Sequence, residues 1–230
     1  MLKPFGHDLW IADGDTVVAA MGFHYPTRMA VIRLADGGLF IWSPVALTDT
    51  LRAEVDALGP VRHLIAPNAL HHVFIAEWKR AYPGAMLYAP PGLRAKRPDL
   101  VFDADLSDEP AAGWVGQIDQ VLMAGNAITT EIVFFHAPSR TAIFTDLIQH
   151  LPPSWFSGWR AIVARLDLMT APEAAVPRKF RMAFTNRRAA RAALSRVLAW
   201  PSDRVLMAHG APISADGQAF LRRAFRWLMP

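Results

Sequence analysis

The alternation of apolar and amphipathic segments between residues 61 and 89 constrains the fold of this chain most. Residues 61–66 are a short apolar run, which predicts a buried strand. Residues 73–82 repeat apolar side chains such as Trp78 at helical spacing, and Pro-Gly follows directly. Residues 85–89 predict the next strand. Because a strand–helix–strand connection brings the chain back in the same direction, we expect two neighbouring parallel strands in an α/β fold.

Before this unit the sequence predicts antiparallel hairpins. Residues 29–34 and 39–42 are β-like runs, and the Asp-Gly-Gly sequence at 36–38 is a turn signal between them. A second hairpin is expected between residues 9 and 19, with its turn in the Asp-Gly-Asp sequence at 13–15. The chain therefore begins as a meander and continues as an alternating α/β unit.

Two further strands matter for function because polar side chains follow them. Residues 141–145 predict a strand that ends at Asp146, and residues 204–207 predict one that ends at His209. No internal repeat or linker interrupts the chain. Since 230 residues can bury one good core, we expect a single domain over residues 1–230.

The composition excludes several classes of protein and site. With 53% hydrophobic and 19% charged residues, the chain is not a disordered polymer. It has no cysteine, so disulfides, thiolate nucleophiles and cysteine-bound zinc are excluded. No apolar run approaches the roughly 20 residues that cross a bilayer. The start of the sequence also lacks the apolar stretch of a signal peptide, so we expect a cytoplasmic protein.

Basic residues gather between positions 178 and 196, where seven arginines and lysines occur without an acidic residue. Such a segment can face nucleic acid or an acidic lipid surface. It can equally be a solvated helix face whose charges pair with acidic residues elsewhere. Nucleic acid therefore stays open as a partner, although a small-molecule substrate is the partner that we expect.

Metal-capable side chains follow three of the predicted strands. His71 and His72 come after residues 61–66, and Asp146 and His209 follow the two later strands. Because the loops at strand ends converge in α/β folds, these side chains are expected to meet. A single His or Asp there is also a common cap or turn former, but four in this order favour a site. Three imidazoles and one carboxylate suit one divalent transition metal ion, zinc or iron, with manganese as a further choice.

This order of residues resembles the metallo-β-lactamase fold superfamily, and within it an uncharacterised, DUF4336-like branch that carries a Pro-Asn-x-x-His-His motif. The superfamily motif His-x-His-x-Asp-His falls on residues 67–72 of this sequence, and its Gly-His-Thr segment falls near residues 125–127. Its later Asp matches Asp146, and its last His matches His209 in Ala-His-Gly-Ala-Pro. The resemblance implies an αββα sandwich, in which two mixed β-sheets pack face to face with helices on the outer faces.

The departures from the superfamily motif fall on one metal position. Members of the superfamily commonly hold two metals, and the ligands of the first metal are replaced here by Pro67, Ala69 and Asn126. The positions of the second metal keep competent ligands, with His71 standing where the motif has Asp. We therefore interpret the site as mononuclear, with the second metal position kept and the first lost.

The resemblance and the ligand set together predict a metal-dependent hydrolase-like protein of unknown substrate. Asp146 would bind the metal, Asn68 would orient substrate or water, as would Asn126, and Glu131 would act as a base. An exposed strand residue is the alternative interpretation of Glu131. An iron-dependent oxidoreductase on the same site and a non-catalytic metal-binding protein are the alternative functions. The aromatic cluster at 155–159 would either line the substrate pocket or belong to the core.

Overall fold

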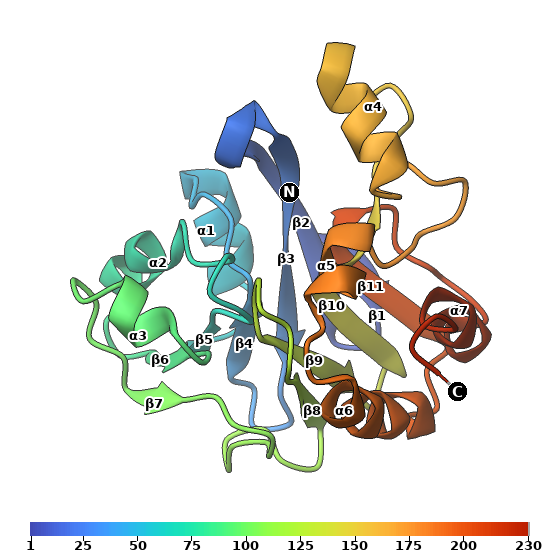
Figure 1. Cartoon of the computed structure of the whole chain (residues 1–230). Helices are drawn as coiled ribbons and strands as arrows, with labels where there is room; N and C mark the ends of the chain where they lie inside the picture. Colours follow the sequence, from blue (N-terminus) through green and yellow to red (C-terminus); the bar gives the residue numbers. More distant parts are fainter. Residues whose placement is uncertain (230) are drawn as a thin grey trace.

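Two β-sheets face each other in the computed structural model, which describes residues 1–229 (Figure 1). The larger sheet has its seven strands in sequence order: β1 (Lys3–Gly6), β2 (Leu9–Val18), β3 (His24–Arg33), β4 (Leu39–Trp42), β5 (Val61–Ile65), β6 (Met86–Ala89) and β7 (Ala104–Asp105). The smaller sheet has the order β11 (Arg204–Gly210), β10 (Thr141–His150), β9 (Glu131–His136), β8 (Ile118–Met123). Both sheets contain parallel and antiparallel pairs.

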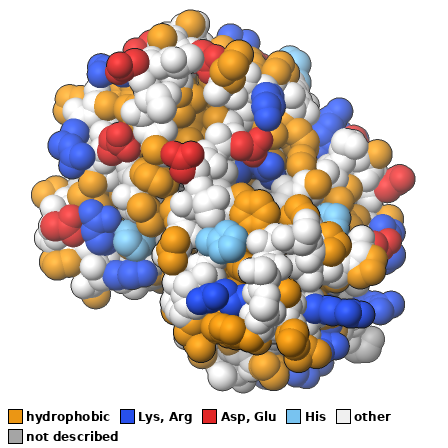
Figure 2. All heavy atoms as spheres, turned by 90° about the horizontal axis from the view of Figure 1, so that it is seen from above, with side chains coloured by type: hydrophobic (Ala, Val, Ile, Leu, Met, Phe, Trp, Pro, Cys, Tyr) orange, Lys and Arg blue, Asp and Glu red, His pale blue; other side chains and the backbone are white. Residues whose placement is uncertain are grey.

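Helices cover the outer faces of both sheets. The larger sheet carries α1 (Asp49–Asp56), α2 (Ile75–Ala81) and α3 (Leu93–Lys96), and the smaller one carries α5 (Arg178–Ala183), α6 (Arg187–Ala199) and α7 (Gly217–Ala224) (Figure 1). Helix α4 (Gly158–Leu166) projects from the body (Figure 1), and its Arg160 donates a hydrogen bond to the Met21 carbonyl in the turn after β2. Figure 2 shows the molecule from above, at the end where α4 lies. Hydrophobic side chains lie among charged ones on this surface, together with histidine side chains. The predicted αββα sandwich is confirmed.

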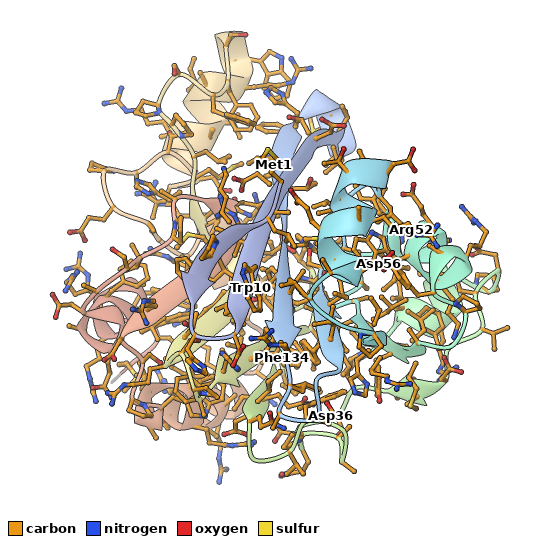
Figure 3. All side chains as sticks on the ribbon, turned by 180° about the vertical axis from the view of Figure 1, so that it is seen from behind. Met1, Trp10, Asp36, Arg52, Asp56 and Phe134 are labelled. Atoms are coloured by element: carbon orange, nitrogen blue, oxygen red, sulfur yellow. The ribbon has the colours of Figure 1, made fainter. Side chains whose placement is uncertain are left out.

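Successive side chains of each strand point to opposite faces of its sheet, and this produces three apolar layers: one between the sheets and one between each sheet and its outer helices. Phe40 and Trp42 of β4 point into the space between the sheets, whereas Leu39 and Ile41 point toward the outer helices. The smaller sheet follows the same rule, and its Phe134 fills the inner layer (Figure 3). Because side chains alternate with period 2, one apolar run supplies both a sheet–sheet and a sheet–helix interface.

The predicted parallel unit is present, and it extends to two further strands. β5 pairs in parallel with β6, as the strand–helix–strand order predicts; β4 pairs in parallel with β5, and β7 with β6. Helix α1 begins after Thr48, whose side chain accepts a hydrogen bond from the Leu51 amide. The loop that carries His71 and His72 follows the carboxyl end of β5 directly.

The predicted turn at 13–15 is wrong. β2 runs without a break from Leu9 to Val18, and the chain reverses instead around the short 3₁₀ helix η1 (Ala20–Gly22). The Asp-Gly-Asp sequence lies at an irregularity where the register with β3 shifts after Gly14. A Cβ at Gly14 would lie 2.6 Å from Thr27 Oγ1 and Val45 Cβ, so this glycine serves a close approach rather than a turn.

The predicted end of a strand at Asp146 is also wrong. β10 continues to His150, but its pairing with β9 stops at Ile143 and its register with β11 shifts between Phe144 and Gln149. A local irregularity of this kind breaks the ladder without ending the strand. Asp146 lies in that irregular stretch, which frees its side chain from the regular in–out alternation.

The basic segment lies mainly in α5 and α6. Arg196 forms an ion pair with Asp108, and Arg191 donates a hydrogen bond to the Leu228 carbonyl. Part of this charge is therefore paired within the chain. Within residues 1–229, no helix has the length and apolar character needed to traverse a membrane. The single domain over residues 1–230 stays a prediction, and Pro230 lies outside the described residues.

Buried His136 makes the stability of the fold depend on pH. Its side chain is 1% exposed and hydrogen-bonds Ser139 Oγ through Nδ1, and burial lowers its pKa to about 4 from the usual 6.5. Between these pH values the unfolded chain binds a proton that the folded chain does not, so stability falls as the pH falls through this window. We expect this histidine to cost about 2 kcal/mol of unfolding free energy at pH 5 relative to pH 7.5.

Urea denaturation of the wild type and of His136→Gln at both pH values measures this cost. The variant should lose about 2 kcal/mol less than the wild type on acidification. Val115→Gln, at an exposed residue whose side chain does not titrate, serves as the control and should keep the wild-type pH dependence. Equal pH dependence of His136→Gln and the wild type would contradict the prediction.

Candidate metal centre

Three side chains from distant parts of the chain converge at the end of the sandwich above the parallel strands. His71 lies in the loop between β5 and α2, Asp146 in the irregular part of β10, and His209 near the end of β11. The two Nε2 atoms are 3.2 Å apart, and they lie 3.4 Å (His71) and 3.3 Å (His209) from the oxygens of Asp146. Their ligand atoms all lie within 4.8 Å of one another, so a single ion would contact all three.

Hydrogen bonds at the opposite ring nitrogens aim both imidazoles at this point. His209 Nδ1 donates to the Pro26 carbonyl at 2.8 Å, which leaves the lone pair of Nε2 free. His71 Nδ1 is hydrogen-bonded to Ser43 Oγ at 2.8 Å. Ligating histidines are commonly held in this way, because the outer partner selects both the tautomer and the ring orientation. The donor set and its surroundings therefore fit a bound transition metal.

The electrostatics of the site keep its carboxylate charged. Burial alone would raise the pKa of Asp146, but His71 and His209 more than offset this effect, and the pKa lies well below its ordinary value. Asp146 and His209 are buried, and His71 is only partly exposed. A charged oxygen donor is thus available at neutral pH, together with two imidazole nitrogens.

Asn68 holds the loop and the carboxylate together. Its side chain is fully buried; Nδ2 donates to Asp146 Oδ2 at 2.7 Å and to Thr145 Oγ1 at 2.9 Å. Its Oδ1 accepts hydrogen bonds from the amides of Leu70 and His71. One amide side chain therefore positions two of the three converging groups. Asn68 contacts the Asp146 carboxylate directly and is not among the residues that line the cavity described below.

Removing this amide should weaken metal binding without removing a ligand. For Asn68→Ala we expect a 10–100-fold lower metal affinity, roughly the loss that follows removal of an outer-shell partner. A competition titration against a fluorescent chelator measures the change. Asn186→Ala is the matched control, since this residue only caps helix α6, where its side chain accepts from the Ala189 amide. An unchanged affinity in Asn68→Ala would contradict the positioning role.

Glu131 lies behind Asp146 rather than in open space, and it is not an exposed strand residue. It is fully buried, and its two oxygens accept from the amides of Thr145, Asp146 and Leu147. Burial, with the Asp146 charge nearby, raises its pKa to about 7. Both oxygens are thus engaged by the backbone, and the side chain does not reach the cavity described below. Its expected role as a base facing substrate is therefore corrected to that of a residue that shapes the irregular part of β10.

His72 does not join the converging group. Its Nδ1 accepts a hydrogen bond from Arg97 at 3.1 Å, and the same guanidinium donates to its carbonyl. Burial, with Lys96 and Arg97 close by, lowers the pKa of His72 to about 4. Consecutive residues in this loop point different ways, so only His71 turns toward Asp146. The structure thus brings together three of the four predicted ligands.

Two other predicted features have structural roles. Asn126 is buried, where it donates to the Phe180 carbonyl and accepts from the amides of Ile128 and Thr129. In the 155–159 cluster, Phe156 belongs to a buried apolar cluster and Trp155 Nε1 donates to the His24 carbonyl. None of residues 155–159 lines the cavity described below. The core interpretation holds for Phe156, whereas Trp159 is 46% exposed.

Sequence reasoning missed the residues that support the histidines. Ser43, which contacts His71, has a φ of 50°, a conformation that non-glycine residues rarely adopt. Arg28 pairs with Asp13 and donates to the carbonyls of Met207 and Gly210, on either side of His209. These contacts join residues of both sheets, and no local motif in the sequence signals them.

A cavity of about 480 Å³ opens onto the converging group. His71, Asp146 and His209 line one part of it, and residues 17–20 at the tip of β2 line another. The remaining wall is largely apolar. A cavity of this size accommodates a small molecule beside the three side chains.

Comparison with known proteins places the chain in a family. The model of the family described as Domain of unknown function (DUF4336) matches residues 8–157. The chain belongs to this family. The matched residues include the loop with His71 and the irregular part of β10 with Asp146, whereas His209 lies beyond them. A search of curated proteins finds no match.

Solved structures share the fold of this DUF4336 chain at low sequence identity. The metal-soaked flavodiiron core of Flv1 from Synechocystis sp. PCC6803 is 11% identical, with a TM-score of 0.66 over 99% of this chain and 60% of that one. The metallo-β-lactamase from Pontibacter korlensis is 12% identical, with a TM-score of 0.63 over 99% and 98%.

The mono-zinc form of the metallo-β-lactamase FIM-1 from Pseudomonas aeruginosa is 11% identical, with a TM-score of 0.63 over 100% of this chain and 96% of that one. At such identities the likeness establishes the fold alone. The resemblance to the metallo-β-lactamase fold is confirmed. The chain spans only 60% of the flavodiiron core.

Proposed function

We propose that this protein is a metal-dependent hydrolase-like enzyme that holds one divalent transition metal ion on His71, Asp146 and His209. The observation that carries the proposal is the convergence of two Nε2 atoms and a carboxylate, with each Nδ1 anchored behind it. Two histidines and one carboxylate form a three-ligand set like that of catalytic zinc sites, which keep a further position for water or substrate. Zinc and iron are the ions that we propose.

The proposed site is mononuclear, with the first metal position of the superfamily lost. Pro67 and Ala69 carry no ligand atom in their side chains, and the side chain of Asn126 is engaged by backbone groups. Among residues 1–229, a single group of three or more metal-capable side chains lies close enough to share an ion. These features support one ion per chain, at the second metal position.

A bound divalent ion would supply Lewis acidity and lower the pKa of a water molecule toward neutrality. The side chains of this protein would hold the site in shape. Asn68 would fix the orientation of Asp146, and Glu131 would hold the irregular stretch of β10 that presents it. The small-molecule substrate would enter through the cavity of about 480 Å³.

The same donor set favours a second function. Two histidines and one carboxylate are also the ligands of non-haem iron(II) oxygenases, so an iron-dependent oxidoreductase is the second candidate. A binding protein without catalysis would use the same three ligands. The identity of the ion separates the first two, because zinc has no redox chemistry.

Elemental analysis by mass spectrometry, on protein purified without added metal, tests the proposal. We expect close to one transition metal ion per chain. Zinc would support the hydrolase, and iron with an optical or spin signal would support the oxidoreductase. Two ions per chain would contradict the mononuclear site. Absence of any ion, with no binding on metal addition, would contradict the metal-dependent function.

A further inference from the structure

We infer that the substrate of this site is an anionic amphiphile, a small molecule with an apolar chain and a carboxylate or phosphate group. This inference rests on the proposed function, because it assigns a substrate class to the same cavity. It follows from two properties of the cavity wall that the metal ligands do not require.

The first property is an exposed apolar rim. Val18, Leu70, Val73 and Ile128 line the cavity, and their exposed fractions are 76%, 40%, 56% and 46%. They come from the tip of β2, the loop before α2 and the loop before β9. Exposed apolar surface around a cavity is typical of a binding site, since a ligand that covers it removes apolar area from water. A wholly polar substrate would leave this rim in water.

The second property is a positive charge without an internal partner. The chain has four lysines, Lys3, Lys79, Lys96 and Lys179, and the last two line the cavity. Lys179 forms an ion pair with Asp167 at 3.1 Å. Within residues 1–229, the Lys96 ammonium instead donates only to the Ala69 carbonyl, at 2.7 Å. Lys96 is therefore the group available to an anion.

The charges around the cavity disfavour a cationic substrate. Asp146 is the one acidic residue among the described residues that line it, and its oxygens face His71 and His209. A ligand with an apolar chain on the rim and an anionic group near Lys96 would satisfy both features of the wall. The anionic group would then lie on the side of α3, where Lys96 is located.

Calorimetric titration of the metal-free protein with three decyl probes tests this inference. The probes are decanoate, decanol and decyltrimethylammonium, each below its micellar concentration at pH 8 and moderate ionic strength. We expect decanoate to bind with one molecule per chain, more tightly than decanol, and the cationic probe to bind most weakly. Binding of the cation as tightly as decanoate would overturn the role of the charge.

Two pairs of variants separate charge from apolar contact. Lys96→Ala should weaken decanoate about fivefold and leave decanol unchanged, as expected for an exposed ion pair. Lys3→Ala is its control, because this lysine pairs with Asp13 away from the cavity. Ile128→Ser should weaken decanoate and decanol alike, about fivefold. Val101→Ser is the matching control, being 82% exposed and outside the cavity wall.

The outcomes distinguish this inference from the proposed function. Absence of saturable decanoate binding by the metal-free protein, when elemental analysis of the protein as purified finds one metal ion per chain, would overturn the substrate class alone. Decanoate binding without any metal binding would contradict the proposed function and leave the amphiphile site standing. Sedimentation with anionic phosphatidylglycerol vesicles, without binding of monomeric decanoate, would also overturn the inference, because the apolar rim would then contact a membrane.

Discussion

His209→Ala should weaken metal binding by the folded protein more than about 100-fold. The change removes one of three converging ligand atoms, and the two that remain, on His71 and Asp146, are 3.4 Å apart. Removal of a residue behind a ligand costs about 10–100-fold in affinity, so loss of the ligand itself should cost more than about 100-fold. Competition with a chromogenic chelator measures the affinity, and elemental analysis measures the retained ion.

Thermal denaturation provides an independent measurement of the same change. With free metal at 1,000 times its dissociation constant, the ion should stabilise the wild type by about 4 kcal/mol. At the same metal concentration, an affinity lowered more than about 100-fold leaves His209→Ala with less than about 1.4 kcal/mol of this stabilisation, whereas His7→Ala, at an exposed histidine, should behave as the wild type does. The proposed ligand set would be wrong if His209→Ala retained wild-type affinity and stabilisation.

Glu131→Ala should be the most destabilising single change near the site. The carboxylate accepts from the amides of Thr145, Asp146 and Leu147, which have lost their regular partners in the irregular stretch of β10. Without it, three buried amides lose their acceptors, and each unsatisfied group costs about 1–3 kcal/mol. We expect a loss of about 3–5 kcal/mol in the free energy of unfolding, because the removal of a buried carboxylate offsets part of this cost. Urea denaturation of the metal-free protein measures it.

Glu131→Gln separates the hydrogen bonds from the charge. The amide side chain keeps one oxygen acceptor but turns an NH₂ donor toward backbone donors, so an intermediate loss of about 1–3 kcal/mol is expected. Glu109→Ala, at an exposed loop residue, should change stability by less than about 0.5 kcal/mol. A Glu131→Ala protein as stable as the wild type would show that these amides find other partners.

The sequence predicted the layers of the fold but not the local irregularities. Residues 39–42 form a continuous apolar run, and because successive side chains of a strand point to opposite faces, such a run indicates a strand that is buried on both faces. The Asp-Gly-Asp sequence at 13–15 has the residues of a turn, yet β2 continues through it because Gly14 permits a close approach to Thr27 and Val45. Turn chemistry is local, whereas a close approach depends on tertiary contacts.

The sequence by itself determined the alternating α/β unit and three residues of the proposed site, and its resemblance to the metallo-β-lactamase superfamily implied the αββα architecture. His71, Asp146 and His209 could be found because strand ends converge at one edge of parallel strands. Only the tertiary structure decided the direction of each side chain. In the folded chain, His72 turns toward Arg97, and Glu131 lies behind Asp146. Hydrogen bonds to Ser43 and to the Pro26 carbonyl orient the imidazoles of His71 and His209, respectively. Spacing along the chain restricts where a residue lies, but its orientation depends on partners far away in sequence.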